Sequence, residues 1–198
     1  QKTYLMKAYE SNNRMVALLG DMSASEKVTA EKLKTGTLEY SMFPDLADNV
    51  LTEIQPLAQK RGVSLLFADR KDSYLPAKIV PKNMRAILQN LLENAIKYTN
   101  TGGTVTFSVR DQDDTIVLAV ADTGIGIPEE QKKNIFKRFF RAQNAVRLET
   151  DGSGLGLFIV LSIVERFKGQ ISFESTEGKG TTFRVVLPAA ASAKKMLS

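Results

Sequence analysis

Three polar side chains follow one edge of a strongly periodic stretch at residues 81–99. Asn90, Asn94 and Lys97 are spaced i, i+4 and i+7, so they share one side of a predicted helix. Asparagine is a poor helix former, and each one costs about half a kcal/mol relative to alanine. An isolated asparagine would most simply be a solvated surface residue. A pair beside a lysine instead offers oxygens to Mg²⁺ without adding negative charge near a polyphosphate, while the lysine supplies counter-charge.

The glycine-rich stretch DGSGLGL occupies residues 151–157, at the start of a strongly apolar helix predicted over 154–168. Its three glycines let backbone N–H groups approach an anion, and the helix N-terminus adds a favourable field. A plain glycine-rich turn is the alternative. The stretch is not a P-loop, because it lacks the order G-x-x-x-x-G-K-[ST]. It is not a dinucleotide-binding motif either, because no acidic residue ends a second parallel strand after it.

A second pair of glycines lies in DTGIGIP, residues 122–128, directly after an alternating apolar run. Asp122 ends the predicted strand, where a carboxylate can accept a hydrogen bond from an exocyclic amine such as that of adenine. The glycines leave space for a flat ring. A lone aspartate at a strand end is more often a turn former, so the stretch alone leaves both interpretations open.

Residues 131–147 carry six basic side chains and no acidic one. A solvated surface is the simplest interpretation of such a run. Nucleic acid is another common partner of basic segments, but no recognised binding motif accompanies this one, so we expect no nucleic-acid partner.

The overall composition excludes several kinds of chemistry. The 198 residues contain no histidine, which rules out a histidine base, a histidine metal ligand and a Ser-His-Asp triad within the chain. Any metal is therefore a hard ion held by oxygen ligands. The absence of cysteine fits a reducing compartment, and no apolar run is long enough for a membrane span. Since the sequence opens QKTYLM, without an initiator methionine, we expect a fragment of a longer protein.

Hydrophobic periodicity predicts which elements position these residues. Alternation predicts strands at 63–68, 104–110, 115–121, 170–175 and 181–187, and helical spacing predicts helices at 44–62, 81–99 and 154–168. Hairpins outnumber β-α-β units, which favours an α+β fold. We expect a two-layer α/β sandwich with a mixed, largely antiparallel sheet and helices on one face. A long helix within residues 1–40 is expected to precede this domain at 41–188, and 189–198 would be a flexible tail.

Four blocks in order resemble the catalytic ATP-binding domain of bacterial sensor histidine kinases, in the superfamily shared with gyrase, a heat-shock chaperone and the mismatch-repair ATPases. The blocks are NLLENAIKYT (90–99), DTGIGIP (122–128), IFKRFFRA (135–142) and DGSGLGLFIV (151–160), which look like the N box, first glycine box, F box and second glycine box. GKGTTF (178–183) is similar to a third glycine stretch. The resemblance covers about residues 44–188.

The resemblance implies a role for each matched residue. Asn94 would be the principal Mg²⁺ ligand, with Asn90 beside it. Asp122 would accept a hydrogen bond from adenine, and Arg138 would contact or steer the terminal phosphate. The catalytic set would be Asn90, Asn94, Lys97 and Arg138. The other ATP-binding positions would be Tyr98, Gly124, Gly126, Ile127, Gly152, Ser153, Gly154, Leu155, Gly156, Leu157 and Thr181. Residues 129–151 would form a mobile lid.

The same resemblance implies a partner that this chain lacks. Residues 1–40 look like the second helix of a dimerisation and phosphoacceptor domain, whereas the first helix, with the accepting histidine, is absent. We therefore predict a cytoplasmic protein-histidine kinase region that uses Mg-ATP to phosphorylate an upstream histidine, for relay to a response regulator. We expect the full protein to be a homodimer. Upstream segments could anchor that protein in the inner membrane. The alternatives are a related ATPase, or a nucleotide-binding regulatory module without phosphotransfer.

Overall fold

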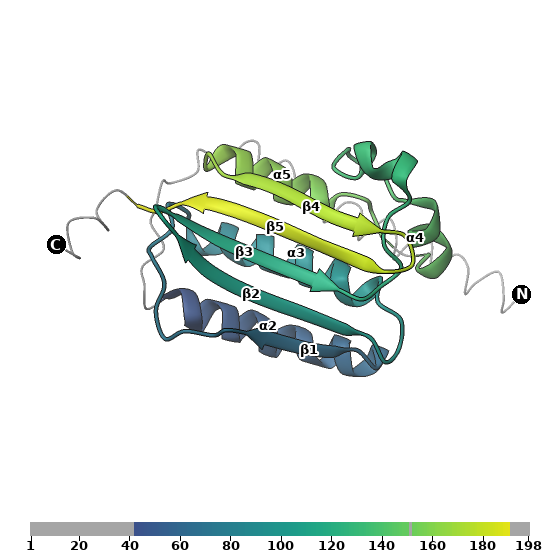
Figure 1. Cartoon of the computed structure of the whole chain (residues 1–198), viewed down its shortest axis with the longest axis horizontal. Coiled ribbons are helices and arrows are strands. Elements are labelled where there is room, and N and C mark those ends of the chain that lie inside the picture. The colour runs from purple at the N-terminus through teal and green to yellow at the C-terminus, as the bar shows by residue number, and fades with distance from the viewer. Residues whose placement is uncertain (1–41, 151, 191–198) are drawn as a thin grey trace, which may run out of the picture.

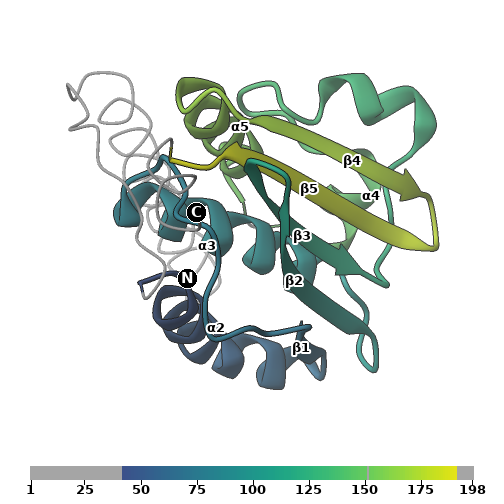
Figure 2. The same ribbon diagram turned by 60° about the vertical axis from the view of Figure 1, so that its left-hand side comes forward.

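The computed structural model describes residues 42–150 and 152–190, which form two layers (Figure 1). One layer is a five-stranded sheet in the order β1-β2-β3-β5-β4. The other layer consists of α2, α3 and α5, which lie on the same face of the sheet, with α3 between the other two helices (Figure 2). This arrangement confirms the predicted α+β sandwich.

The strands are β1 (Ser64–Ala68), β2 (Thr104–Gln112), β3 (Thr115–Asp122), β4 (Gln170–Thr176) and β5 (Gly180–Pro188). Only β1 pairs in parallel, with β2, and the other three pairings are antiparallel. The sheet is therefore mixed and largely antiparallel, as predicted. The β2–β3 hairpin turns at Asp113 and Asp114, and Asp113 has a φ of 51°. This left-handed conformation, which aspartate tolerates, fits the tight hairpin.

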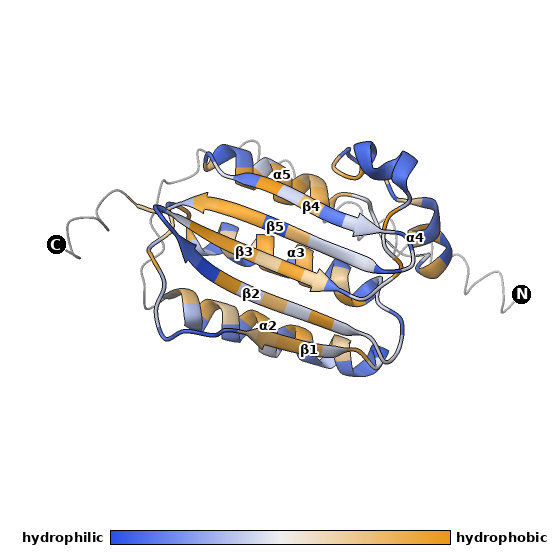
Figure 3. Ribbon diagram, in the orientation of Figure 1, coloured by the Kyte–Doolittle hydropathy of each residue, from blue (hydrophilic) through white to orange (hydrophobic). Residues whose placement is uncertain are grey.

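The helices that pack on the sheet are α2 (Met42–Arg61), α3 (Pro81–Lys97) and α5 (Gly156–Arg166). Pro81 occupies the first turn of α3, where a missing N–H costs nothing. A short 3₁₀ helix, η1 (Glu129–Asn134), and a short helix, α4 (Gln143–Leu148), lie in the segment between β3 and α5. This segment is mostly hydrophilic in Figure 3, in agreement with its polar and basic sequence.

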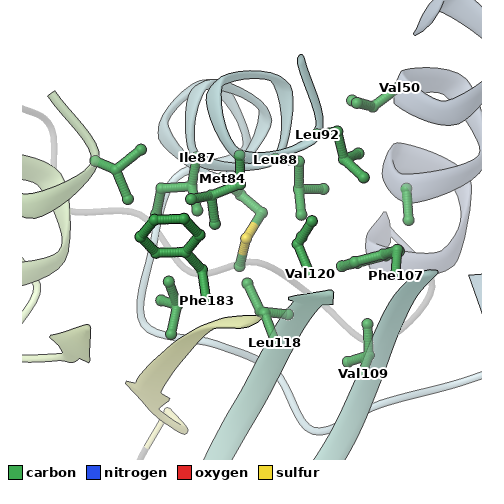
Figure 4. Packing of buried hydrophobic residues seen from close by; sticks show 14 of the residues in the cluster. Val50, Met84, Ile87, Leu88, Leu92, Phe107, Val109, Leu118, Val120 and Phe183 are labelled. Atoms are coloured by element: carbon green, nitrogen blue, oxygen red, sulfur yellow. The ribbon is translucent and has the colours of Figure 1, made fainter. Parts of the chain in front are cut away.

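The core lies between α3 and the middle of the sheet (Figure 4). Ile87 and Leu88 on α3 are fully buried, and so is Phe107 on β2. The apolar face predicted for this helix is buried throughout: Met84, Ile87, Leu88, Leu91, Leu92, Ala95 and Ile96. Because that face is fixed against the sheet, the row of Asn90, Asn94 and Lys97 is fixed at its edge.

Two predicted segments fall mainly outside the described residues. The helix expected within 1–40 lies wholly outside them, as does the tail beyond residue 190. The first two residues of that tail are described: Ala189 forms a bridge with Ala77, and the Ala190 amide donates to the Pro76 carbonyl at 2.7 Å. Among residues 42–150 and 152–190, no helix combines the length and the apolar composition needed to cross a bilayer.

Candidate functional site

A cavity of about 250 Å³ opens where four segments meet: the end of α3, the loop after β3, residues 129–150, and the glycine loop before α5. The segment 129–150 is called the lid below. Most of the predicted site residues line the cavity: Asn90, Asn94, Lys97, Tyr98, Asp122, Gly126, Ile127, Gly152, Ser153, Gly154, Gly156, Leu157 and Thr181. Asn90 and Thr181, 91 positions apart in the sequence, therefore contribute to one site. Gly124, Leu155 and Arg138 are not among the residues that line it.

The α3 side of the cavity presents amide oxygens. Asn90 donates its Nδ2 to the Ala86 carbonyl at 2.8 Å, which fixes the side chain and leaves Oδ1 to accept. A Cβ placed on Gly156 would lie 2.7 Å from Asn90 Oδ1 and 3.6 Å from Asn94 Nδ2. Glycine at the start of α5 thus keeps space open beside both asparagines.

Charge on this side of the cavity comes from a neighbouring pair. Lys97 Nζ donates to Glu93 Oε2 at 3.1 Å, and both residues line the cavity. In the described part of the chain, no cluster of three or more acidic, histidine or cysteine residues could hold a metal ion. A divalent ion here would rely on asparagine oxygens together with oxygens of a ligand, which suits Mg²⁺.

Asp122 lies at the end of β3, opposite Thr181 of β5. Its Oδ1 accepts from the Gly124 amide at 2.9 Å and from the Thr181 amide at 3.2 Å. Burial raises the pKa of this carboxyl to about 6, although both backbone hydrogen bonds act to lower it. With both of these bonds on one oxygen, Oδ2 is left to accept a hydrogen bond from a ligand in the cavity.

The first glycine pair shapes the loop after β3. A Cβ on Gly124 would overlap the Tyr98 carbonyl oxygen, and the Ile125 amide donates to that same oxygen at 3.0 Å. Gly126 has a φ of 62°, and a Cβ there would overlap the Thr176 carbonyl. The loop is therefore pressed between the end of α3 and the β4–β5 turn. Gly126 also lines the cavity, whereas Gly124 is required for the close backbone approach.

The glycine loop before α5 also depends on close backbone contact. Gly154 has a φ of 71°, and its carbonyl accepts from the Phe139 amide at 3.0 Å. A Cβ on Gly154 would lie 2.7 Å from the Phe139 backbone. The Leu155 side chain is buried in the core, which explains why it does not reach the cavity. The loop therefore delivers the N-terminus of α5, eleven residues long, to one side of the cavity.

The phenylalanines of the lid take different roles. Phe136 and Phe140 pack against the core, and Phe136 meets Phe173 edge-on with ring centroids 5.9 Å apart. Phe139 differs from both: its side chain is 56% exposed, and its φ is 62°. The Arg138 guanidinium lies over the Phe158 ring, 4.3 Å from its centroid.

Arg141 was not singled out from the sequence, yet it lines the cavity. Its Nη1 donates to the carbonyls of Thr150 at 3.1 Å and Gly152 at 3.3 Å, and its Nη2 donates to the Glu149 carbonyl. Its Nε is buried without a partner in the described structure. The only sequence signal was its place as the second arginine of RFFRA. Spacing alone could not rank it above Arg138, because the segment is irregular.

Comparison with known proteins places this chain in one family. Over residues 79–191, more than half of its length, the chain matches the family described as Histidine kinase-, DNA gyrase B-, and HSP90-like ATPase. The chain belongs to this ATPase family, which confirms the resemblance seen in the four sequence blocks.

Named relatives are sensor histidine kinases. The chain is 32% identical over 189 residues to the circadian input-output histidine kinase CikA of Synechococcus elongatus, covering 95% of this chain and 25% of the relative. It is 30% identical over 192 residues to the sensor protein GacS of Pseudomonas syringae pv. syringae, covering 94% and 21%. The chain thus spans a quarter or less of the length of these two relatives.

Solved structures of histidine kinases share the fold. Full-length ShkA in complex with AMPPNP superposes with a TM-score of 0.73 at 25% identity, covering 96% of this chain and 40% of that protein. The nucleotide-free catalytic domain of the histidine kinase ThkA gives a TM-score of 0.66 at 27% identity, covering 79% of this chain and 97% of that domain.

Proposed function

We propose that this chain is the ATP-binding catalytic region of a sensor histidine kinase and that Mg-ATP binds in the cavity beside α3. One observation carries the proposal: the cavity joins a partly buried carboxylate, two neutral asparagines and a glycine-rich helix start. These groups suit an adenine, a divalent ion and a polyphosphate respectively. Family membership supports the proposal, as does the similarity to ShkA, which was solved with AMPPNP.

Each end of the nucleotide has a matching set of groups. Asp122 accepts a hydrogen bond from the exocyclic amine of adenine through Oδ2, while Thr181 holds Oδ1. Tyr98 and Ile127 flank the base, beside Gly126. Asn94 and Asn90 hold Mg²⁺ through their side-chain oxygens. When bound, the ion neutralises phosphate charge and orients the terminal phosphate.

The loop before α5 and basic side chains bind the phosphates of ATP. Backbone N–H groups of residues 152–157 and the α5 N-terminus receive the phosphates. Lys97 contributes counter-charge once it leaves Glu93. Arg141 is better placed than Arg138 to contact a phosphate, because it lines the cavity and its Nε is unpaired. Arg138 reaches a phosphate only by leaving the Phe158 ring.

The phosphoryl acceptor is a histidine outside these 198 residues, since the sequence contains none. In the transfer, a histidine nitrogen bonds to the γ-phosphorus while the bond from that phosphorus to the bridging oxygen breaks, and ADP leaves. This chain contributes positioning and charge neutralisation. A phosphoacceptor helix of the same or a partner subunit, a homodimer, and a response-regulator aspartate complete the proposed relay.

Labelling with ATP carrying a radioactive γ-phosphate tests the transfer. The 198-residue chain alone is expected to bind ATP and remain unlabelled. The protein extended upstream to its phosphoacceptor helix is expected to gain acid-labile, base-stable label, as a phosphohistidine does. Release of inorganic phosphate with no protein label in the extended protein would instead favour an ATPase. ATP binding with neither label nor hydrolysis would favour a regulatory module.

A further inference from the structure

We propose that the ion pair between Arg61 and Glu149 positions the C-terminal end of the lid and thereby slows nucleotide release. Arg61 is the last residue of α2, and Glu149 follows α4. Neither residue lines the cavity. The inference rests on the proposed function, because it concerns the residence time of ATP in that cavity.

The ion pair joins two distant parts of the chain, separated by 88 positions. Arg61 Nη2 donates to Glu149 Oε2, and the Arg61 and Glu149 side chains are only 32% and 17% exposed. A pair sheltered to this extent is weakened less by solvent than an exposed surface pair. It can therefore hold the end of the lid against the helical layer.

Arg61 also bonds to the helix that carries the polar row. Its Nη1 donates to the Lys97 carbonyl at 3.2 Å, at the last turn of α3. The next carbonyl, that of Tyr98, accepts from Ile125 in the loop of the first glycine pair. Two consecutive carbonyls, of the last α3 residue and of the residue that caps it, thus accept one bond each: Lys97 from Arg61, and Tyr98 from the loop.

Glu149 connects the ion pair to the cavity. Its backbone carbonyl accepts from Arg141, which also bonds to the carbonyls of Thr150 and Gly152. Arg141 lines the cavity, so a shift of Glu149 would move a cavity side chain and the glycine loop together. Ala142, Asn144 and Ala145 of the lid line the cavity as well. Release of a nucleotide behind these residues requires the lid to move.

A double-mutant cycle with a fluorescent ATP analogue tests the proposal by stopped-flow chase with excess ATP. Arg61→Met and Glu149→Gln are each expected to raise the dissociation rate about fivefold, because each removes the charge-assisted, partly buried contact between the two side chains. Arg61→Met also removes the bond to the Lys97 carbonyl, so it is expected to be the faster of the two single variants. The double variant should dissociate no faster than the faster single variant, because both changes break the same contact. The association rate is expected to change less than twofold.

Arg85→Gln is the matched control. Arg85 Nη1 donates to Glu53 Oε2 at 2.7 Å and so also links α3 to α2, but it does not touch the lid. Its dissociation rate should equal that of the wild type. Thermal midpoints of all variants, measured without nucleotide, separate a local effect on the lid from general loosening.

The outcomes are distinguishable. Wild-type dissociation rates in both single variants would overturn the proposal, as would multiplying effects in the double variant. An equal acceleration in Arg85→Gln would overturn it too, because the cause would then be looser packing of α2 on α3. A wild-type chain that binds neither the analogue nor ATP would overturn the proposed function and this inference together.

Discussion

Asp122 and Thr181 are paired across β3 and β5, and the Thr181 amide donates to Asp122 Oδ1 at 3.2 Å. The Gly124 amide donates to the same oxygen at 2.9 Å. Two strands and one loop therefore fix this carboxylate in a place where burial raises its pKa to about 6. A fixed acceptor with one oxygen still available suits recognition of an amine in a flat heterocycle.

Asp122→Asn tests that recognition with little change of shape. The amide oxygen can still accept from Gly124 and Thr181, but the charged acceptor for adenine is lost. ATP affinity is expected to fall by about ten- to a hundredfold, the cost of one charge-assisted hydrogen bond. Isothermal titration calorimetry measures this loss. The thermal midpoint at pH 8 should stay equal or rise, because a buried charge has been removed. Wild-type ATP affinity in the variant would contradict the assignment.

The raised pKa of Asp122 predicts two opposite pH effects. Without ligand, folding favours the neutral form of Asp122 relative to the unfolded chain, because the folded pKa is the higher one. The contribution of this group to the free energy of unfolding is therefore fully present below pH 3.8 and is lost as pH rises through about 6. ATP needs the charged acceptor, so its affinity should fall as pH drops through about 6. Binding isotherms from pH 5 to 8 would show this, and Asp122→Asn is the control, since the phosphates of ATP titrate alike in both proteins.

Gly126→Ala and Gly178→Ala distinguish the cost of steric overlap from the cost of a left-handed backbone conformation. The φ values are similar, 62° and 76°, but a Cβ at Gly126 would overlap the Thr176 carbonyl. A Cβ at Gly178 would have no heavy atom of the described residues within 4 Å, apart from its chain neighbours. Gly178→Ala should cost about 1–2 kcal/mol of unfolding free energy, the cost of a left-handed conformation for alanine. Gly126→Ala should cost clearly more and also weaken ATP binding. Equal urea midpoints for the two variants would show that the overlap is relieved without cost.

Asn94→Ala tests the metal assignment. The variant should lose most of the affinity that Mg²⁺ adds to ATP binding, because one oxygen ligand is missing, while metal-free binding changes little. Titrations with Mg²⁺ and with EDTA measure both quantities. Leu66→Ala, an exposed position on β1, serves as the control and should behave as wild type. An unchanged Mg²⁺ effect in Asn94→Ala would exclude Asn94 as a ligand.

Periodic segments were predictable, whereas irregular ones were not. The helix predicted at 81–99 is α3, Pro81–Lys97, because an unbroken apolar face leaves only one way to pack it. The lid has no such repeat. Its arginines could not be ranked from spacing, and Arg138 lies over Phe158 while Arg141 reaches the cavity. The exposure of Phe139 is likewise set by tertiary contacts of Gly154 with its backbone.

The glycines illustrate the same limit at the level of single atoms. Their positions in DTGIGIP indicated that bare backbone was needed, but not against which group. The structure shows the Tyr98 carbonyl against Gly124 and the Thr176 carbonyl against Gly126, contacts between segments far apart in the sequence. The sequence alone therefore located the loop, while only the fold shows which backbone groups contact it.

Calorimetric titration of the 198-residue chain with Mg-ATP and with Mg-GTP tests the central claim most directly. Guanine presents a carbonyl where adenine presents its amine, so it would set an oxygen against the Asp122 carboxylate. We expect one ATP bound per chain at pH 8, displaced by ADP, with GTP binding at least about tenfold more weakly. Absence of ATP binding, or equal affinity for the two nucleotides, would contradict the claim.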